Sequence, residues 1–245
     1  ETFNPDVCFH LAAQSSVVIS VEDPLLDFEH NLLQPIKLLQ KLIHTDCKKF
    51  VFSSSGGTIF GEPNVIPTSE KDYAGEPVSP YGVAKKKLND FIKLMLQEKN
   101  MSYSILNLAN VYGPRQDPHG EAGVMSIFTG RMLNNETPIV YGDGNQTRDY
   151  IFVTDVVSAL IKSSEMDDNL FLNIGTSKET SVNELVSIIR SITSWKGEPD
   201  YKPQREGELL RSVLNNEKAK KSLNWEPEYN LNRGIEELVN WFKNE

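Results

Sequence analysis

The chain has few cysteines and no long apolar run. Among its 245 residues there are only two cysteines, Cys8 and Cys47, and their positions do not have the spacing of metal ligands. We expect each thiol to fill a core position in a reducing compartment rather than to form a disulfide. Because no stretch of about 18 apolar residues occurs, the sequence gives no indication of a membrane-spanning helix.

Basic residues are fewer than acidic ones, and two kinds of sequence signal are absent. Lys and Arg number 25 against 34 Asp and Glu, giving a formal charge of -9 that makes nucleic acid an unfavourable partner. No basic segment followed by an apolar one opens the chain, so a signal peptide is not indicated and we expect a cytoplasmic protein. No G-x-G-x-x-G stands between a strand and a helix, so the usual glycine fingerprint of a dinucleotide site is missing.

The residues that are present indicate a folded α/β protein. Hydrophobic residues make up 39% of the chain and charged residues 24%, which is enough apolar material for a sizeable core. Short apolar runs predict buried strands, and apolar residues at helical spacing predict helices between them. In the first half these are strands at 6–11, 49–53 and 103–107 and helices at 24–42 and from Pro80 onward. Such alternation is typical of a parallel sheet with helices on both faces.

Local signals refine this pattern. Pro35 lies within the first predicted helix, where we expect it to kink the helix or to mark its first turns. Ser79 and Pro80 are typical of an N-cap and a first helical residue. The second half is less regular, and Ser181 with Glu184 has the spacing of a capping box. The apolar pattern of this second half predicts a strand at 138–141 and helices at 124–133, 154–164, 181–193, 215–223 and 231–243.

Tyr81 and Lys85 are candidates for proton transfer. They stand four residues apart in the segment 79–85, Ser-Pro-Tyr-Gly-Val-Ala-Lys, and so share one face of the predicted helix. A free tyrosine has a pKa of about 10, too high for a base at neutral pH, and a nearby cation favours the phenolate. The alternative is a core aromatic residue with an exposed lysine one turn on, and the pair alone favours that alternative.

Small hydroxyl residues follow the second predicted strand. The segment 52–61 reads Phe-Ser-Ser-Ser-Gly-Gly-Thr-Ile-Phe-Gly. Ligands bind at the carboxyl ends of parallel strands, so Ser55 or Thr58 could hold a substrate oxygen in line with Tyr81. By itself, the segment fits an ordinary loop better.

The order of the motifs is more specific than either motif alone. With the strand that follows them, they resemble the extended short-chain dehydrogenase/reductase family, the NAD-dependent epimerases and dehydratases of nucleotide sugars. The resemblance implies a Rossmann-like doubly wound parallel sheet with a smaller α/β substrate-binding domain. The supporting segments span nearly the whole chain: 9–14 (Phe-His-Leu-Ala-Ala-Gln), 53–61, 79–85, 110–115 (Asn-Val-Tyr-Gly-Pro-Arg), 142–150 (Gly-Asp-Gly-Asn-Gln-Thr-Arg-Asp-Tyr) and 205–208 (Arg-Glu-Gly-Glu).

The resemblance also implies a domain division and a set of cofactor contacts. Residues 1–110, with contributions from about 148–175, would form a partial NAD-binding domain, and 111–245 would form the nucleotide-sugar-binding domain. Lys85 would hydrogen-bond the cofactor ribose, and Asn31 would support the strand ends or the cofactor. The full set of residues that the resemblance assigns to NAD is Leu11, Ala12, Ala13, Asn31, Ser53, Tyr81, Lys85 and Ala109.

The nucleotide sugar would lie on the other side of the catalytic pair. Arginine recognises phosphate through two parallel hydrogen bonds, so Arg148 and Arg205 would clamp the diphosphate. Arg148 could instead be a surface cation paired with a neighbouring aspartate. The resemblance assigns substrate contacts to Gln14, Asn110, Tyr141, Arg148, Arg205 and Glu208, of which Tyr141 would pack on the uracil and Glu208 would bind the ribose.

Two departures from the family pattern bear on the expectation. The usual catalytic Ser or Thr position is Gly56 here, so Ser55 or Thr58 must substitute, and Ser55 is favoured narrowly. The glycine fingerprint is absent because the chain begins at what would be the fourth strand, about 60 residues or two βα units into the fold. The chain could therefore be an inactive fragment or a binding or scaffold protein.

The residues that follow the predicted strand at 49–53 indicate which reaction of the family to expect. Dehydratases and decarboxylases of this family carry an acid there, and this chain has Gly56, Gly57 and Thr58 instead. We therefore expect simple oxidation and re-reduction at C4 of a UDP-hexose, which is epimerisation, with NAD as cofactor. A decarboxylase, dehydratase or reductase of the same family is the alternative. A homodimer through the helices near 24–44 and 80–99 is also expected.

Overall fold

A four-stranded parallel sheet forms the larger part of the molecule. The computed structural model describes residues 3–117, 123–204 and 209–244. The sheet order is β1 (Val7–His10), β2 (Lys49–Ser55), β3 (Ser102–Leu108) and β8 (Leu170–Ile174), and every pair is parallel. The expected parallel α/β architecture is therefore confirmed, and β8 is a strand that the sequence pattern did not predict.

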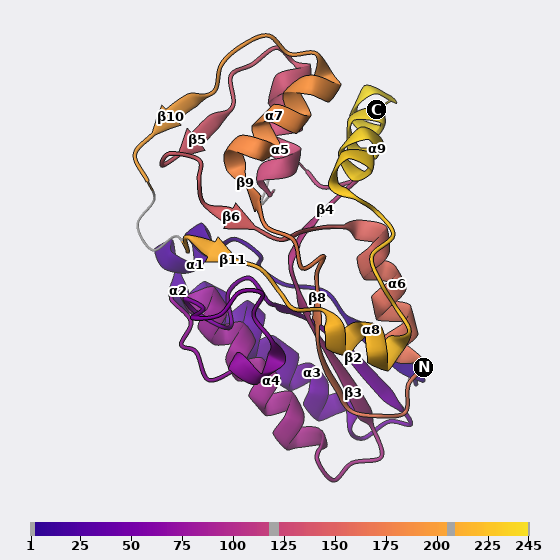
Figure 1. The fold of residues 1–245 in the computed structure, drawn as a ribbon. Coiled ribbons are helices and arrows are strands. Elements are labelled where there is room, and N and C mark those ends of the chain that lie inside the picture. The colour runs from indigo at the N-terminus through magenta and orange to yellow at the C-terminus, as the bar shows by residue number, and fades with distance from the viewer. Residues whose placement is uncertain (1–2, 118–122, 205–208, 245) are drawn as a thin grey trace.

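Helices cover both faces of this sheet (Figure 1). Successive strand residues point to opposite faces, so Phe50 and Phe52 pack against one helical layer while Val51 packs against the other. The first layer contains α3 (Gln34–Leu42) and α4 (Pro80–Leu96), and the second contains α6 (Val153–Ser164) and α8 (Glu217–Leu223).

The helix expected over residues 24–42 is interrupted. It consists of α2 (Pro24–Phe28), a π-helical turn η1 (Glu29–Leu33) and α3, and it is preceded by the short helix α1 (Val17–Glu22). Pro35 lies in the first turn of α3 and has no N–H to donate, while Gln34 N–H donates to the carbonyl of Glu29, five residues earlier. The proline thus marks a first turn, which is one of its two expected effects.

A smaller lobe has its own core. Figure 1 shows its helices α5 (Val124–Leu133), α7 (Val182–Thr193) and α9 (Leu231–Asn244) grouped beyond the end of the large sheet. Their apolar faces meet in one cluster that includes Phe128, Leu185 and Leu238. The Ser181–Glu184 capping box is present at the start of α7. This lobe thus has an apolar core separate from those of the large sheet, and the division of the chain into two domains remains a prediction.

Short strands make up the regular structure outside the large sheet and the helices. The pairs are β4 (Asn110–Tyr112) with β7 (Tyr150–Phe152) and β5 (Ile139–Tyr141) with β10 (Asp200–Lys202), and a three-stranded sheet has the order β11 (Arg211–Ser212), β6 (Thr147–Arg148) and β9 (Thr180–Ser181). A 3₁₀ turn, η2 (Glu70–Asp72), completes the regular structure of the described residues. No helix among them is long and apolar enough to cross a membrane.

The apolar side chains of α4 are buried to different degrees. Leu88 and Ile92 are fully buried against the sheet, but Phe91 is 41% exposed. Its position on the helix is rotated away from the line through Lys85, Leu88 and Ile92, so it lies at the edge of the packed face. Phe91 is therefore not a core residue of the single chain.

Candidate active site

A cleft of about 650 Å³ lies where the large sheet meets the smaller lobe. The carboxyl ends of β2 and β3, the start of α4 and the strand β6 all contribute to its wall. Of the residues expected in the site, Ser55, Thr58, Tyr81, Ala109, Asn110 and Arg148 line this cleft. Ten residues that were not assigned there also line it: Ser15, Val17, Val18, Val21, Glu22, Gly57, Val78, Ser79, Leu108 and Leu209.

The start of α4 places Tyr81 at the cleft. The Ser79 hydroxyl accepts a hydrogen bond from Gly82 N–H at 3.2 Å and Pro80 opens the helix, as the sequence predicted. Gly82 allows the helix to approach the serine loop, because a Cβ on it would lie 2.9 Å from the Thr58 carbonyl oxygen. Tyr81 is only 9% exposed, and that exposure faces the cleft.

Lys85 lies below Tyr81, inside the protein. Its side chain is almost fully buried, and Nζ donates to the carbonyl of Ser53 at 3.1 Å. The ammonium stands 5.7 Å from the centre of the Tyr81 ring and 4.9 Å from that of Phe52. Burial lowers the pKa of Lys85 to about 8, and the carboxylate of Asp27 opposes that effect. The alternative of an exposed lysine is thereby excluded.

The serine loop offers two hydroxyl groups to the cleft. The Thr58 hydroxyl is directed to the Ser55 carbonyl at 3.4 Å, whereas the Ser55 hydroxyl has no partner among the described residues. At Gly56, where the resemblance predicts Ser or Thr, there is no room for a side chain. A Cβ there would lie 2.4 Å from Leu214 and 3.1 Å from the Asn107 carbonyl oxygen. A hydroxyl at position 56 would therefore require Leu214 to move.

A second cavity of about 510 Å³ lies at the end of β1. Ala12 and Ala13 line it together with His10, whereas Leu11 is 50% exposed and lines neither cavity. The His10 ring stacks with both Phe50 and Phe52. Burial, followed by the charge of Lys85, lowers the pKa of His10 to about 4.

Gln14, for which a substrate contact was expected, does not line the cleft. It lines the second cavity, and its amide is used within the chain: Nε2 donates to Asp27 Oδ1 at 2.7 Å and to the Ser16 carbonyl, while Oε1 accepts from Ser16 N–H. Asn31 joins the same network, because its Nδ2 donates to Asp27 Oδ1 and to the Gln14 carbonyl. Sequence reasoning missed Asp27, although its spacing of four residues from Asn31 on one helix was a usable signal.

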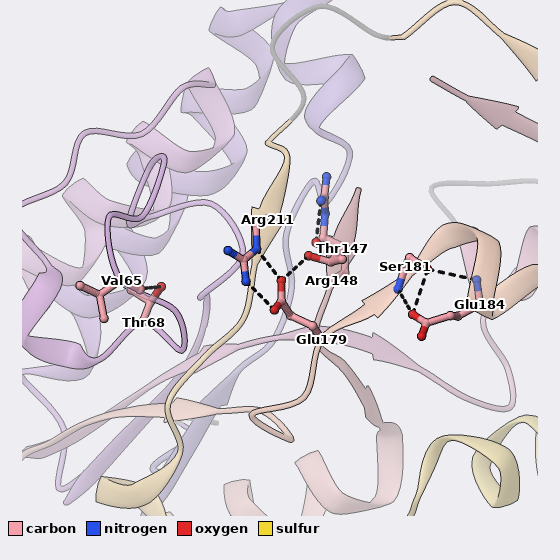
Figure 2. A network of polar contacts seen from close by, with 8 residues as sticks. All are labelled: Val65, Thr68, Thr147, Arg148, Glu179, Ser181, Glu184 and Arg211. Atoms are coloured by element: carbon pink, nitrogen blue, oxygen red, sulfur yellow. Dashed lines mark hydrogen bonds and ion pairs between the residues drawn. The ribbon is translucent and has the colours of Figure 1, made fainter. Parts of the chain in front are cut away.

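The strand β6 presents Arg148 to the cleft. Its neighbour Thr147 donates to Glu179 Oε1 at 2.7 Å, and Arg211 of β11 holds both oxygens of Glu179, at 2.7 and 2.6 Å. Figure 2 shows Arg148 extending away from this cluster, as alternation along a strand requires. Arg148 also donates to the Thr147 carbonyl at 2.9 Å. The contacts of Thr147 and Arg211 with Glu179 therefore hold β6 on the face opposite to the Arg148 side chain.

The remaining expected substrate contacts are placed in part. Asn110 is exposed at the cleft, and its backbone N–H donates to the Asp149 carbonyl. Tyr141 is half-buried on β5, paired with Lys202 of β10, and does not line the cleft. Arg205 and Glu208 lie outside the described residues.

The geometry fits a nicotinamide nucleotide at the strand ends. Lys85 Nζ carries three protons and makes one hydrogen bond within the described part of the chain. His10 Nε2 and Asn31 Oδ1 are buried there without a hydrogen-bond partner. Both are groups that a polar ligand could satisfy. By contrast, no three His, Cys, Asp or Glu side chains of the described residues cluster as metal ligands would.

Known proteins resemble this chain over nearly its whole length. The sequence model of the GDP-mannose 4,6-dehydratase family matches residues 1–238. A putative UDP-glucose 4-epimerase of Methanocaldococcus jannaschii is 47% identical over 98% of this chain and 77% of that protein. The UDP-glucose 4-epimerase of Mycolicibacterium smegmatis is 41% identical over 99% of this chain and 77% of that protein.

Solved structures show the same fold. The UDP-glucose 4-epimerase of Thermotoga maritima with UDP-glucose has a TM-score of 0.95 and 46% identity, covering 98% of this chain and 78% of that one. The UDP-glucose 4-epimerase of Thermus thermophilus in complex with NAD has a TM-score of 0.90 and 36% identity, with the same coverage. The expected Rossmann-like fold is therefore confirmed.

The environment of His10 predicts a pH dependence of stability. Its folded-state pKa of about 4 lies below the ordinary value of 6.5, so unfolding takes up a proton between these values and stability falls as the pH drops through them. We expect His10→Gln to remove about 1 kcal/mol of the stability lost between about pH 7 and pH 5, allowing for solvent near this partly exposed ring. Urea denaturation at both pH values measures the difference.

His44 supplies the control, because it is exposed and lies outside this site. His44→Gln should retain the loss of stability seen in the parent protein. If His10→Gln retained it equally, the effect of burial on His10 would be contradicted.

Proposed function

The chain belongs to the GDP-mannose 4,6-dehydratase family, and we propose that it is an NAD-dependent epimerase that inverts C4 of a UDP-hexose. Membership confirms the resemblance to the epimerases and dehydratases of nucleotide sugars. Two relatives more than 40% identical are named as UDP-glucose 4-epimerases, one of them putatively, and similar structures were solved with UDP-glucose or NAD. The substrate is thus a nucleotide sugar and the cofactor is NAD.

The observation that carries this function is the pairing of Tyr81 with Lys85 at the cleft. The phenol borders the cleft, the buried ammonium lies under it, and the Ser55 hydroxyl stands on the same wall. Within the serine loop, the residues at 56–58 supply no carboxylate that could move a proton at a second sugar carbon. This supports epimerisation over dehydration.

The residues have distinct tasks in the reaction. Bound NAD supplies a reversible hydride acceptor for the sugar C4. Tyr81, as phenolate, removes the proton of the 4-hydroxyl and returns it when the ketone is reduced. Ser55 holds the same oxygen and fixes its distance from Tyr81. Lys85 keeps a positive charge beside the phenol, which favours its ionised form.

Binding is assigned to the two ends of the cleft. At the diphosphate end, Arg148 would bind the phosphates and Asn110 a phosphate oxygen, since both line the cleft. At the sheet end, Ser53 and Ala109 would lie beside the nicotinamide, and Asn31 would hold the strand ends. Gln14 is better assigned to the network around Asp27 than to the substrate.

The function is tested by product analysis. We expect protein supplied with NAD to convert UDP-galactose into UDP-glucose, and Tyr81→Phe to lower kcat by about 100-fold to 10,000-fold because the proton acceptor is lost. Tyr73→Phe is the matched control, since its hydroxyl bonds Asp90 and the Lys86 carbonyl away from the cleft. Carbon dioxide release from UDP-glucuronate would indicate a decarboxylase instead. Neither turnover nor NAD-dependent thermal stabilisation would indicate a binding or scaffold protein.

Ser55 and Thr58 make different predictions. Because the Thr58 hydroxyl is directed to a backbone carbonyl and the Ser55 hydroxyl is available to the cleft, Ser55→Ala should lower kcat by about 10-fold or more, while Thr58→Val should change it little. Steady-state kinetics with UDP-galactose measures both. The reverse order would assign the hydroxyl to Thr58.

We also propose a homodimer through α2, η1 and α4. These elements expose large apolar side chains: Leu25 is 84% exposed, Leu94 is 68%, Leu33 is 46% and Phe91 is 41%. Exposed apolar patches of this kind mark protein interfaces. These elements lie within the two segments, near 24–44 and 80–99, through which the sequence predicts a homodimer.

Replacing one apolar residue of this patch should separate the subunits. Phe91→Asp places a charge in the proposed interface, so light scattering should report a monomer while the far-ultraviolet circular dichroism stays unchanged. Ile161→Asp is the control, because Ile161 is 50% exposed on α6, which packs on the opposite face of the sheet. An unchanged dimer in Phe91→Asp would refute the interface.

A further inference from the structure

Asp149 is a buried carboxylate that the proposed reaction does not use. It is only 1% exposed. Its oxygens accept hydrogen bonds of 2.6 to 3.4 Å from uncharged donors: Thr176 N–H and hydroxyl, Ser177 N–H and Leu214 N–H. Gly175 makes room for the carboxylate, because a Cβ on it would lie 2.4 Å from Asp149 Oδ2. Since a buried carboxylate is costly, a site built so closely around this one requires an explanation.

Asp149 stands at the corner where the chain leaves one small sheet and enters another. β6 ends at Arg148 and pairs with β11 and β9, whereas β7 begins at Tyr150 and pairs with β4. The backbone of Asp149 is bonded on both sides of the corner. Its N–H donates to the Ser212 carbonyl at 3.0 Å, and its carbonyl accepts from Asn110 N–H at 2.9 Å. The position of the corner therefore decides how β6 lies relative to β4.

The carboxylate ties this corner to the large sheet. Thr176 and Ser177 follow the end of β8 at Ile174, whose carbonyl accepts from Ala109 N–H at 2.9 Å. Leu214 follows β11, and its carbonyl accepts from the Ser177 hydroxyl at 2.8 Å. One side chain thus connects the carboxyl end of the large sheet with the ends of β6 and β11.

The two residues bonded to this corner are those assigned to the diphosphate. Arg148 precedes Asp149 in the chain, Asn110 donates to its carbonyl, and both line the cleft. A binding group is effective only where its support holds it within about 0.5 Å of the productive geometry. Tyr81 and Lys85 are held by α4 instead. A change at the corner should therefore affect binding and leave proton transfer intact.

We propose that Asp149 is a positioning residue that holds Arg148 and Asn110 in register with the strand ends of the large sheet and so orients the diphosphate of the substrate. The identity of the ligand rests on the proposed function. The orientation of the two binding residues does not require turnover, because UDP alone contains the diphosphate.

Binding of UDP, measured by isothermal titration calorimetry, tests the proposal. In Asp149→Asn an amide NH₂ replaces one acceptor oxygen and faces backbone N–H donors, so the corner must move. We expect the Kd of UDP to rise about 10-fold or more. KM for the UDP-hexose should rise with it, and kcat should stay unchanged. An unchanged Kd, or an effect confined to kcat, would overturn the proposal.

A milder pair of variants separates positioning from folding, and it decides if Asp149→Asn does not fold. Thr176→Val removes the hydroxyl that donates to Asp149 Oδ1 at 2.6 Å, whereas Thr176→Ser keeps it. The first should raise the Kd of UDP about 3-fold, and the second should retain the parent value. In an Arg148→Ala background, Thr176→Val should raise Kd by less, because the group to be oriented is gone. Equal binding by the two Thr176 variants, or an undiminished effect without Arg148, would refute the proposal.

Asp155→Asn is the matched control. Asp155 is 4% exposed, and its carboxylate also accepts from backbone N–H groups, those of Glu228 and Tyr229 at 3.1 and 3.2 Å. It does not line the cleft. Asp155→Asn should lower the midpoint of urea denaturation and leave the Kd of UDP unchanged. A rise in Kd equal to that of Asp149→Asn would overturn the proposal, because any buried carboxylate would then have the same effect.

Binding and turnover together separate this proposal from the proposed function. A parent protein that binds UDP but converts no UDP-hexose would contradict the proposed function alone, and the Kd values of the variants would still test Asp149. Normal turnover with the same Kd in the parent protein, Asp149→Asn and Thr176→Val would refute the positioning role alone. A parent protein that does not bind UDP would contradict both.

Discussion

The buried ammonium of Lys85 is the interaction on which the rest of the site depends. An ammonium moved away from water is stable only where acceptors and opposite charge replace the solvent. Here the Ser53 carbonyl at the end of β2 accepts its hydrogen bond, and the aromatic rings of Phe52 and Tyr81 flank it. The α2–η1 layer then provides the carboxylate of Asp27. Groups on β2, α4 and α2 therefore all act on the charge of Lys85.

Close backbone approach brings the start of α4 to the serine loop. Gly82 lets the first turn of α4 lie against the serine loop, and Gly56 lets that loop lie against Leu214. Position 56 thus has no hydroxyl, and the hydroxyl residues of this loop that line the cleft are Ser55 and Thr58.

The smaller lobe contributes through a minimal sheet. Two-residue strands have little stability of their own, and β6 is held by hydrogen bonds on both edges and by the contacts of Thr147 and Arg211 with Glu179. The Glu179–Arg211 ion pair is partly exposed, so it contributes little to the free energy of folding. Its main effect is to fix the orientation of β6. What it orients is Arg148, the residue on the opposite face that reaches the cleft.

The sequence by itself determined the class of fold, the helix start at Ser79 and the proximity of Tyr81 to Lys85, because these depend on local periodicity and capping. It could also propose Ser55, Asn110 and Arg148, since residues at the carboxyl ends of parallel strands meet at one edge. Only the tertiary structure decided that Gln14 serves Asp27, that Phe91 is exposed, that Leu170–Ile174 completes the sheet and that Val17 and Leu209 line the cleft. Those outcomes depend on which elements pack together, and the burial of a charge such as Lys85 is a property of that packing, not of any local pattern.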